Sequence, residues 1–155
     1  MNKDFLKKAI QLSDEKMQAG CGGPFGAVIV KDGKVIAEGW NQVTSSHDPT
    51  AHAEVVAIRK AASLLKSFEL TGCEIYSSCE PCPMCLSAIY WARLDKIYFA
   101  NTRHQAAEIG FSDNFLYEEV IKPIAVRSIP TIHLPDKDAE KVFSNWQSKL
   151  DKMAY

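Results

Sequence analysis

The chain lacks several features that would assign it to a particular class of protein. Its 18 basic and 19 acidic residues leave a net charge of −1, so overall charge gives no attraction to nucleic acid. No apolar run approaches the roughly 20 residues of a membrane span, and the N-terminal residues lack the apolar stretch of a signal peptide. No internal repeat or low-complexity tract is present. These absences predict a cytoplasmic protein that binds neither a membrane nor nucleic acid.

What is present is a regular alternation of helix and strand patterns, in one domain over residues 1–155. Helices are predicted at 3–19, 52–65, 82–93 and 136–149, with short helices over 104–120. Strands are predicted at 25–30, 35–40, 73–78 and 96–100, with a weak one at 124–133. The Asp32-Gly33 turn joins the first two strands as a hairpin. This order predicts an α/β fold, a three-layer α-β-α sandwich around a mixed five-stranded sheet.

The cysteines are few, odd in number and unevenly placed. Four of the five fall within the thirteen positions 73–85, and in a reducing compartment such clustering indicates a metal site before disulfides. Cys82 and Cys85, three apart, share a helix face, and a helix start near Pro81 would favour their thiolate forms. With the imidazole of His52, two thiolates and Zn²⁺ form a neutral site that can be buried.

Three protein ligands would leave the fourth zinc position open to a water or hydroxide, as a catalytic site requires. Glu54 is then the group expected to take the proton of that water and return it to the substrate. Residues two apart on a regular helix point to nearly opposite sides. We therefore expect His52 at the helix entrance, so that His52 and Glu54 both face the metal.

Each part of this constellation has a simpler interpretation when taken alone. A Cys-x-x-Cys pair is often redox-active or merely buried, and a histidine at a helix start is usually a capping or surface residue. Together, His52-Ala53-Glu54 and Pro81-Cys82-Pro83-Met84-Cys85 match the H-x-E and P-C-x-x-C pattern of zinc deaminases. Cys79 would close the site if it also coordinated, but its place at a strand end argues against that. Cys21 and Cys73 are expected to be small buried residues.

With these motifs in place, the chain resembles the small bacterial guanine deaminases of the zinc-dependent cytidine and deoxycytidylate deaminase superfamily. The resemblance covers essentially the whole length. It includes residues 22–33, Asn41, 48–54, 78–85, 88–93, the Gly-Phe-Ser-Asp segment 110–113 and the last residue, Tyr155. It implies hydrolysis of guanine to xanthine and ammonia.

The resemblance also implies a purine pocket. In it Phe25 would pack on the ring, Asn41 and the Ala53 backbone would hydrogen-bond its edge, and Trp91 would line the floor. The sequence leaves other roles open. Phe25 and Trp91 could be core aromatic residues, and Asn41 could be a turn residue.

Two further residues are placed by the resemblance at the substrate. Asp113 would face the amino or ring-nitrogen groups and assist Glu54 in catalysis, and Tyr155 would close the site. In this family the C-terminal segment can come from the partner subunit, so a homodimer with an exchanged segment is expected. Asp113 could instead cap a helix over 114–120, and Tyr155 could belong to a frayed end.

Alternative functions remain at this point. The strongest is a tRNA adenosine deaminase, which has similar motifs but needs a basic surface for RNA. In residues 136–152, four lysines are offset by four acidic residues, which argues against such a surface. Guanosine, an aminated triazine or a pterin are other possible substrates. A zinc-binding module without catalysis would leave Glu54 and the open metal position unexplained.

Overall fold

The computed structural model describes residues 2–154, so Tyr155 lies outside the described residues. The chain divides into two compact units, Met1–Asn114 and Phe115–Tyr155, where the sequence predicts one unit over 1–155. All other predicted site residues lie in the first unit. No helix in the described part of the chain is both long and apolar enough to cross a membrane.

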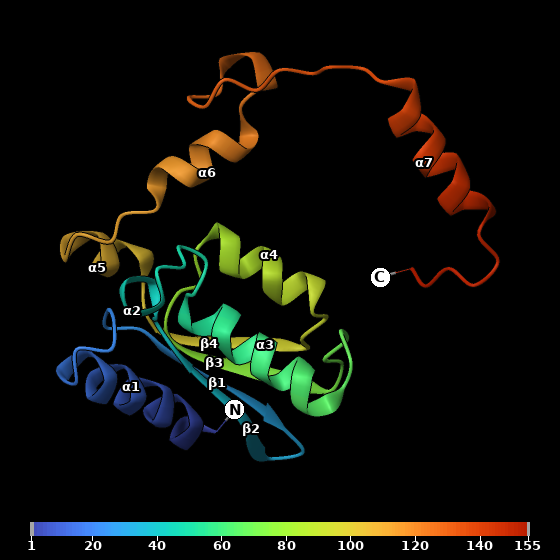
Figure 1. Cartoon of the computed structure of the whole chain (residues 1–155). Helices are drawn as coiled ribbons and strands as arrows, with labels where there is room; N and C mark the ends of the chain where they lie inside the picture. The colour runs from blue at the N-terminus through green and yellow to red at the C-terminus, as the bar shows by residue number, and fades with distance from the viewer. Residues whose placement is uncertain (1, 155) are drawn as a thin grey trace. The chain divides into compact units, whose positions relative to one another are not determined.

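The first unit is an α/β sandwich of three layers (Figure 1). Its strands are β1 (Gly26–Lys31), β2 (Lys34–Trp40), β3 (Cys73–Cys79) and β4 (Lys96–Asn101). Its helices are α1 (Lys3–Gln18), α2 (Val43–Ser46), α3 (Ala53–Leu65), α4 (Pro83–Trp91) and α5 (Arg103–Glu108). The sheet order is β2-β1-β3-β4, with β1 antiparallel to both neighbours and β3 parallel to β4. Helix α1 covers one face, and α3 and α4 cover the other.

The second unit is helical and irregular. It contains most of α6 (Asn114–Ile121), then the 3-10 turn η1 (Ile124–Val126) and α7 (Lys137–Ser148). The fifth strand predicted over 124–133 is not confirmed, and the sheet of the described residues has four strands. Pro123, Pro130 and Pro135 lack backbone N–H donors, and an isolated extended segment has no ladder to join.

Strand β3 separates two apolar cores by the alternation of its side chains. Cys73 and Ile75 belong to the core under α3 and α4, whereas Tyr76 belongs to the core under α1. All three are almost fully buried. The face that bears Cys73 and Ile75 continues toward the C-terminal end of β3, where the site residues gather.

Helix α3 lies unusually close to β2 because both present small residues at the contact. Ala53, Ala57 and Ala61 are spaced four apart on one helix face, and all are fully buried. A Cβ atom built on Gly39 would lie 2.1 Å from the Ala53 carbonyl oxygen and 2.6 Å from the Ala57 nitrogen. The absence of a side chain at Gly39 therefore sets the position of the first turn of α3.

We expect Gly39→Ala to lower the free energy of unfolding by about 1–3 kcal/mol, because the added methyl group meets helix backbone that cannot rotate away. Denaturant unfolding measures this change. Gly23→Ala is the matched control, since its Cβ meets only ring carbons at 3.5 Å or more. Its effect should stay within about 1 kcal/mol, and an equal loss in the two variants would contradict the close-approach explanation.

Candidate metal centre and catalytic site

His52 is the N-cap residue of α3, as predicted, with extended backbone angles of φ −70° and ψ 156°. A tight turn places it there. The Asp48 carboxylate accepts hydrogen bonds from the backbone N–H and hydroxyl of Thr50, at 2.8 and 2.7 Å. The His52 N–H then donates to the Thr50 carbonyl at 2.8 Å. Because the N-cap residue is not yet helical, its side chain can share a side with Glu54.

Cys82 and Cys85 lie at the start of α4, also as predicted. Cys82 is the N-cap residue, Pro83 occupies the first turn, and Cys85 follows one turn along the helix. Proline suits this place because its missing N–H would be unsatisfied there in any residue. The two thiols therefore lie at the positive end of the helix, where negative charge is stabilised.

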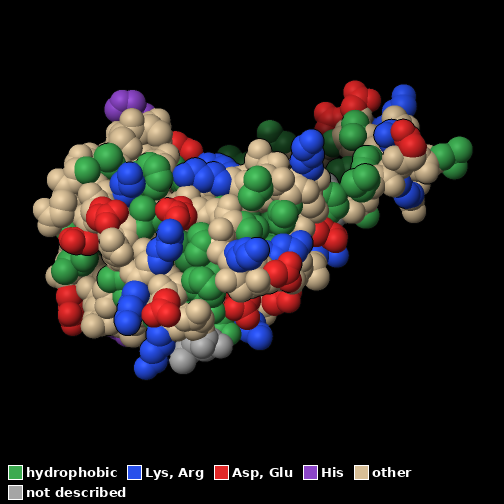
Figure 2. Space-filling model, turned by 90° about the horizontal axis from the view of Figure 1, so that it is seen from below, with side chains coloured by type: hydrophobic (Ala, Val, Ile, Leu, Met, Phe, Trp, Pro, Cys, Tyr) green, Lys and Arg blue, Asp and Glu red, His purple; other side chains and the backbone are tan. Residues whose placement is uncertain are grey.

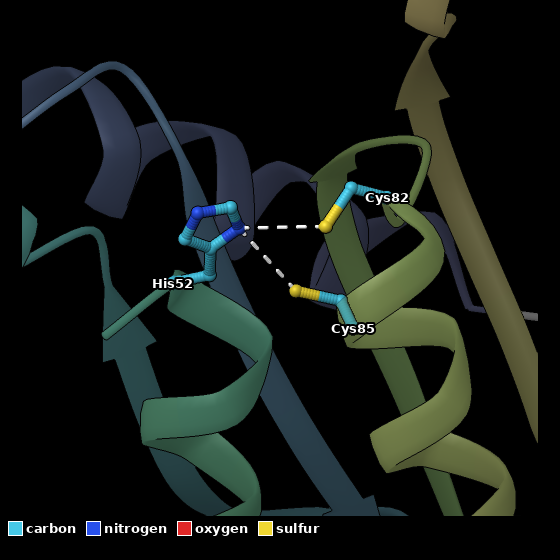
Figure 3. A group of neighbouring side chains, drawn as sticks. All are labelled: His52, Cys82 and Cys85. Carbon is cyan, nitrogen blue, oxygen red and sulfur yellow. Dashed lines mark hydrogen bonds between the residues drawn. The ribbon is translucent and has the colours of Figure 1, made fainter. Parts of the chain in front are cut away.

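The three side chains converge on one point (Figure 3). His52 Nδ1 lies 3.6 Å from Cys82 Sγ and 3.5 Å from Cys85 Sγ, and the three ligand atoms lie within 4.8 Å of one another. Zinc bonds of about 2.3 Å to sulfur and 2.05 Å to nitrogen at a tetrahedral angle give a nitrogen-to-sulfur distance of about 3.6 Å. The donor set and its spacing therefore fit zinc.

The charges of the trio also suit a cation. Hydrogen bonding from the Cys85 thiol, and then from His52, lowers the pKa of Cys82 to about 4, so it is a thiolate at neutral pH. The pKa of His52 is raised, chiefly by its hydrogen bond to Cys82. The pKa of Cys85 is raised by its hydrogen bond to Cys82 and by burial. A metal cation that binds the three side chains would displace the protons in the hydrogen bonds among them and release those protons to solvent.

Glu54 lies on the first turn of α3 with only 6% of its surface exposed. The Ser77 hydroxyl on β3 donates to its Oε1 at 3.0 Å. Burial raises the pKa of the Glu54 carboxyl above its ordinary value, while hydrogen bonds from Ser77 and Cys85 act in the opposite direction. A buried carboxyl with a raised pKa beside a metal site is suited to general acid and base catalysis.

The other cysteines lie outside the trio. Cys79 ends β3, its thiol points to the Thr102 carbonyl at 3.8 Å, and burial raises its pKa to about 11. Cys79 is not part of the group formed by His52, Cys82 and Cys85, whose ligand atoms lie within 4.8 Å of one another, so it is not a fourth ligand. Cys73 is fully buried, as expected, but Cys21 is only partly buried. The expectation for Cys21 was wrong because this residue lies in the loop after α1.

Asn41 and Phe25 lie on neighbouring segments beside the start of α3. The side-chain oxygen of buried Asn41 accepts the backbone N–H groups of Gly23 and Val43, each at 3.3 Å. Phe25 packs edge-on against Phe111, with ring centroids 4.9 Å apart.

Asp113 and Ala53 are also brought toward the metal ligands. Burial, and next the charge of Cys82, raise the pKa of the Asp113 carboxyl. Ala53 is fully buried as the first residue of α3, directly between His52 and Glu54.

Trp91 is not brought to the trio. It follows Cys82 by nine positions at the other end of α4, about 14 Å along the helix, and 66% of its surface is exposed.

Two residues contact predicted site residues but were not assigned a role from the sequence. Ser77 contacts Glu54, and Phe111 contacts Phe25. The signal for Ser77 was available, since it is a hydroxyl on the inward face of a predicted strand, in line with Cys73 and Ile75. Phe111 lies in the 110–113 segment that carries the resemblance, but no pattern indicated its contact with Phe25, because that contact joins two loops distant in sequence.

The ligand set predicts the zinc content of two cysteine variants. Cys85→Ala should lose zinc, because two remaining ligands hold the ion poorly, whereas Cys79→Ala should keep about one zinc per chain. Metal analysis of the purified variants measures this. A zinc-free Cys79→Ala protein that is still folded by circular dichroism would refute the assignment.

Zinc removal should leave Cys82 reactive toward iodoacetamide. Its pKa of about 4 keeps the thiolate populated at higher pH, so its alkylation rate should be nearly constant between about pH 6 and pH 9. Peptide mapping by mass spectrometry identifies the labelled residue. Zinc-loaded protein, in which the sulfur is coordinated, is the protected control. A rate that rises about tenfold per pH unit would contradict the lowered pKa.

Comparison with known proteins supports a deaminase. Residues 1–101 match the family model described as the cytidine and deoxycytidylate deaminase zinc-binding region. A Bacillus subtilis guanine deaminase is 51% identical over 99% of both chains, and an Aquifex aeolicus tRNA-specific adenosine deaminase is 34% identical over 94% of this chain and 93% of the relative. An X-ray structure of Bacillus subtilis guanine deaminase superposes with a TM-score of 0.97 at 52% identity, covering 100% of this chain and 99% of that one. The chain therefore belongs to the zinc-binding cytidine and deoxycytidylate deaminase family.

Proposed function

We propose that the chain hydrolyses guanine to xanthine and ammonia at a site where His52, Cys82 and Cys85 hold zinc. The observation that carries the proposal is the buried Glu54 carboxyl beside a three-ligand site that leaves one metal position free. The full-length similarity to a guanine deaminase supports the substrate.

Zinc, when bound, supplies a Lewis acid that lowers the pKa of a water molecule to about 7. Glu54 takes a proton from that water and delivers it to a ring nitrogen, so that C2 of guanine can accept the new oxygen bond. Glu54 then moves a second proton from the added hydroxyl to the amino group, which leaves as ammonia. One residue can serve as acid and base because each proton it takes is one it delivers.

The surrounding residues would orient the purine. Asn41 offers its NH₂ group to a ring acceptor, since its oxygen is held by two backbone N–H groups. Phe25 would pack on the ring, with Phe111 supporting it from the side. The Ala53 backbone would bond the ring edge. Asp113 would accept from the amino or ring N–H groups and assist Glu54 in protonating the leaving amine.

The experiment that tests the function is ammonia release from a panel of substrates. Guanine should be clearly preferred over guanosine, adenine, cytosine, cytidine, an aminated triazine, a pterin and a tRNA anticodon stem. A hydrogen-bond donor at Asn41 and an acceptor at Asp113 would match the acceptor and N–H groups of guanine. Preference for the tRNA stem would overturn the proposal.

Glu54→Gln should retain zinc and lose at least about 100-fold in kcat, because the amide keeps the shape but cannot carry protons. Zinc content and steady-state turnover of guanine measure the two effects separately. Glu80→Gln is a control in which another carboxylate near Cys82 is neutralised, and it should retain turnover. A Glu54→Gln protein with wild-type kcat would exclude Glu54 from proton transfer.

The rival substrate is tRNA, because a tRNA-specific adenosine deaminase is also similar over most of the chain. Such a protein must bind phosphates with clustered lysine and arginine residues. Figure 2 shows a face on which basic and acidic side chains are interspersed without a continuous basic surface. On the face shown, this distribution of charge favours a small purine over a nucleic acid.

We propose further that the protein is a homodimer with an exchanged C-terminal segment. None of the described residues of 115–154 is buried, and large apolar side chains there are open to solvent. The most exposed are Ile121, Ile129, Ile132, Leu134, Phe143 and Leu150. Among the described residues, strand β4 is at the sheet edge and pairs only with β3. Residues 124–133 of a second copy would pair with β4 as the fifth strand. The exposed apolar side chains of the C-terminal segment would then be covered by contact between the two copies.

Within such a dimer, Tyr155 would close the partner's site, and Trp91 would line a pocket floor once a second copy covers α4. We infer one functional domain over 1–155, because the similarity to guanine deaminase spans the whole chain. A cytoplasmic location suits it, since free thiols that serve as metal ligands persist in a reducing compartment.

Coexpression of Glu54→Gln with Tyr155→Ala tests the exchange. If Tyr155 serves the partner's site, a mixed dimer has one site with both residues intact, so about a quarter of the wild-type sites should be restored. Guanine turnover is compared with that of each variant alone. Activity no greater than the sum of the two single variants would place Tyr155 in its own site.

A further inference from the structure

Ser77 is a hydroxyl group placed where the surrounding pattern calls for an apolar side chain. It shares an inward face of β3 with Cys73 and Ile75, which belong to the core under α3 and α4. Only 1% of its surface is exposed. A buried hydroxyl is costly unless it is hydrogen-bonded, so its partner indicates why it is there.

That partner is Glu54. Ser77 Oγ donates to Glu54 Oε1 at 3.0 Å, across 23 residues of sequence, and both groups are buried. A glutamate side chain has three rotatable bonds and several staggered orientations. A hydrogen bond from the rigid sheet to one carboxyl oxygen restricts those orientations.

The next residue offers a direct comparison. Ser78 is also buried, with 5% exposure, but it lies on the alternate side of β3 and its Oγ accepts the backbone N–H of Gly26 at 3.0 Å. It stabilises the packing of β1 on β3 and has no contact with Glu54 among its hydrogen bonds. Two adjacent buried serines thus differ mainly in whether they contact the acid.

We propose that Ser77 is a positioning residue, whose hydroxyl holds the Glu54 carboxyl in the orientation needed for proton transfer. The inference rests on the proposed function and deepens it, because it adds a residue that acts through Glu54 without touching substrate. The sheet and the helix then have different roles toward Glu54. Helix α3 brings the acid to the site, and β3 orients it.

Steady-state kinetics of the zinc-loaded protein test the proposal. Ser77→Ala should lower kcat about 10- to 100-fold with KM within about twofold, because substrate binding is intact while the acid is misplaced. Zinc content and Tm should remain close to wild type. Ser77→Thr keeps the hydroxyl and should recover most of kcat. Ser78→Ala should retain kcat even if it lowers Tm.

A spectroscopic readout makes the test independent of turnover. The infrared carboxyl band of Glu54, assigned by its absence in Glu54→Gln, should shift in Ser77→Ala and stay in place in Ser78→Ala. An unchanged band, a wild-type kcat in Ser77→Ala, or a kcat lost only in proportion to zinc would overturn the proposal. If the wild-type chain releases no ammonia from any substrate, the proposed function fails, and the band shift still reports on the Ser77 contact.

Discussion

The close packing of α3 on β2 is the contact on which the rest of the site depends. Gly39 lets the backbone of Ala53 and Ala57 approach the strand more closely than any side chain would allow. This contact holds the first turn of the helix, and with it His52 and Glu54, at a defined distance from the sheet. Cys82 and Cys85 on α4 can form one group with His52 only because that position is fixed.

Charge balance decides what such a site can hold. Two helix starts meet at the trio, and both favour negative charge on the side chains between them. Hydrogen bonds from Cys85 and His52 stabilise the Cys82 thiolate and lower its pKa. Burial disfavours the Glu54 carboxylate and raises the pKa of that carboxyl. The site therefore combines an anionic thiolate with a buried carboxyl whose pKa is raised.

The C-terminal unit differs physically from the first. Its helix α7 has a polar face and an apolar face, yet Phe143 is 80% exposed, and no described residue of the unit is buried. Apolar surface of this extent is favourable to cover. The weak strand pattern at 124–133 did not become a strand because strands need partners, and none lies beside this segment within its own unit.

The sequence by itself indicated most of the elements and the three residues, His52, Cys82 and Cys85, that the structure brings together as a possible metal site. Periodicity placed the four confirmed strands and the main helices, and the spacing of His52, Glu54, Cys82 and Cys85 indicated an open neutral site. Only the tertiary structure decided which distant groups meet. It joined Ser77 to Glu54 and Phe111 to Phe25, and it left Trp91 away from the trio. Local patterns record propensity and burial, whereas contacts between segments depend on how closely helices and strands pack.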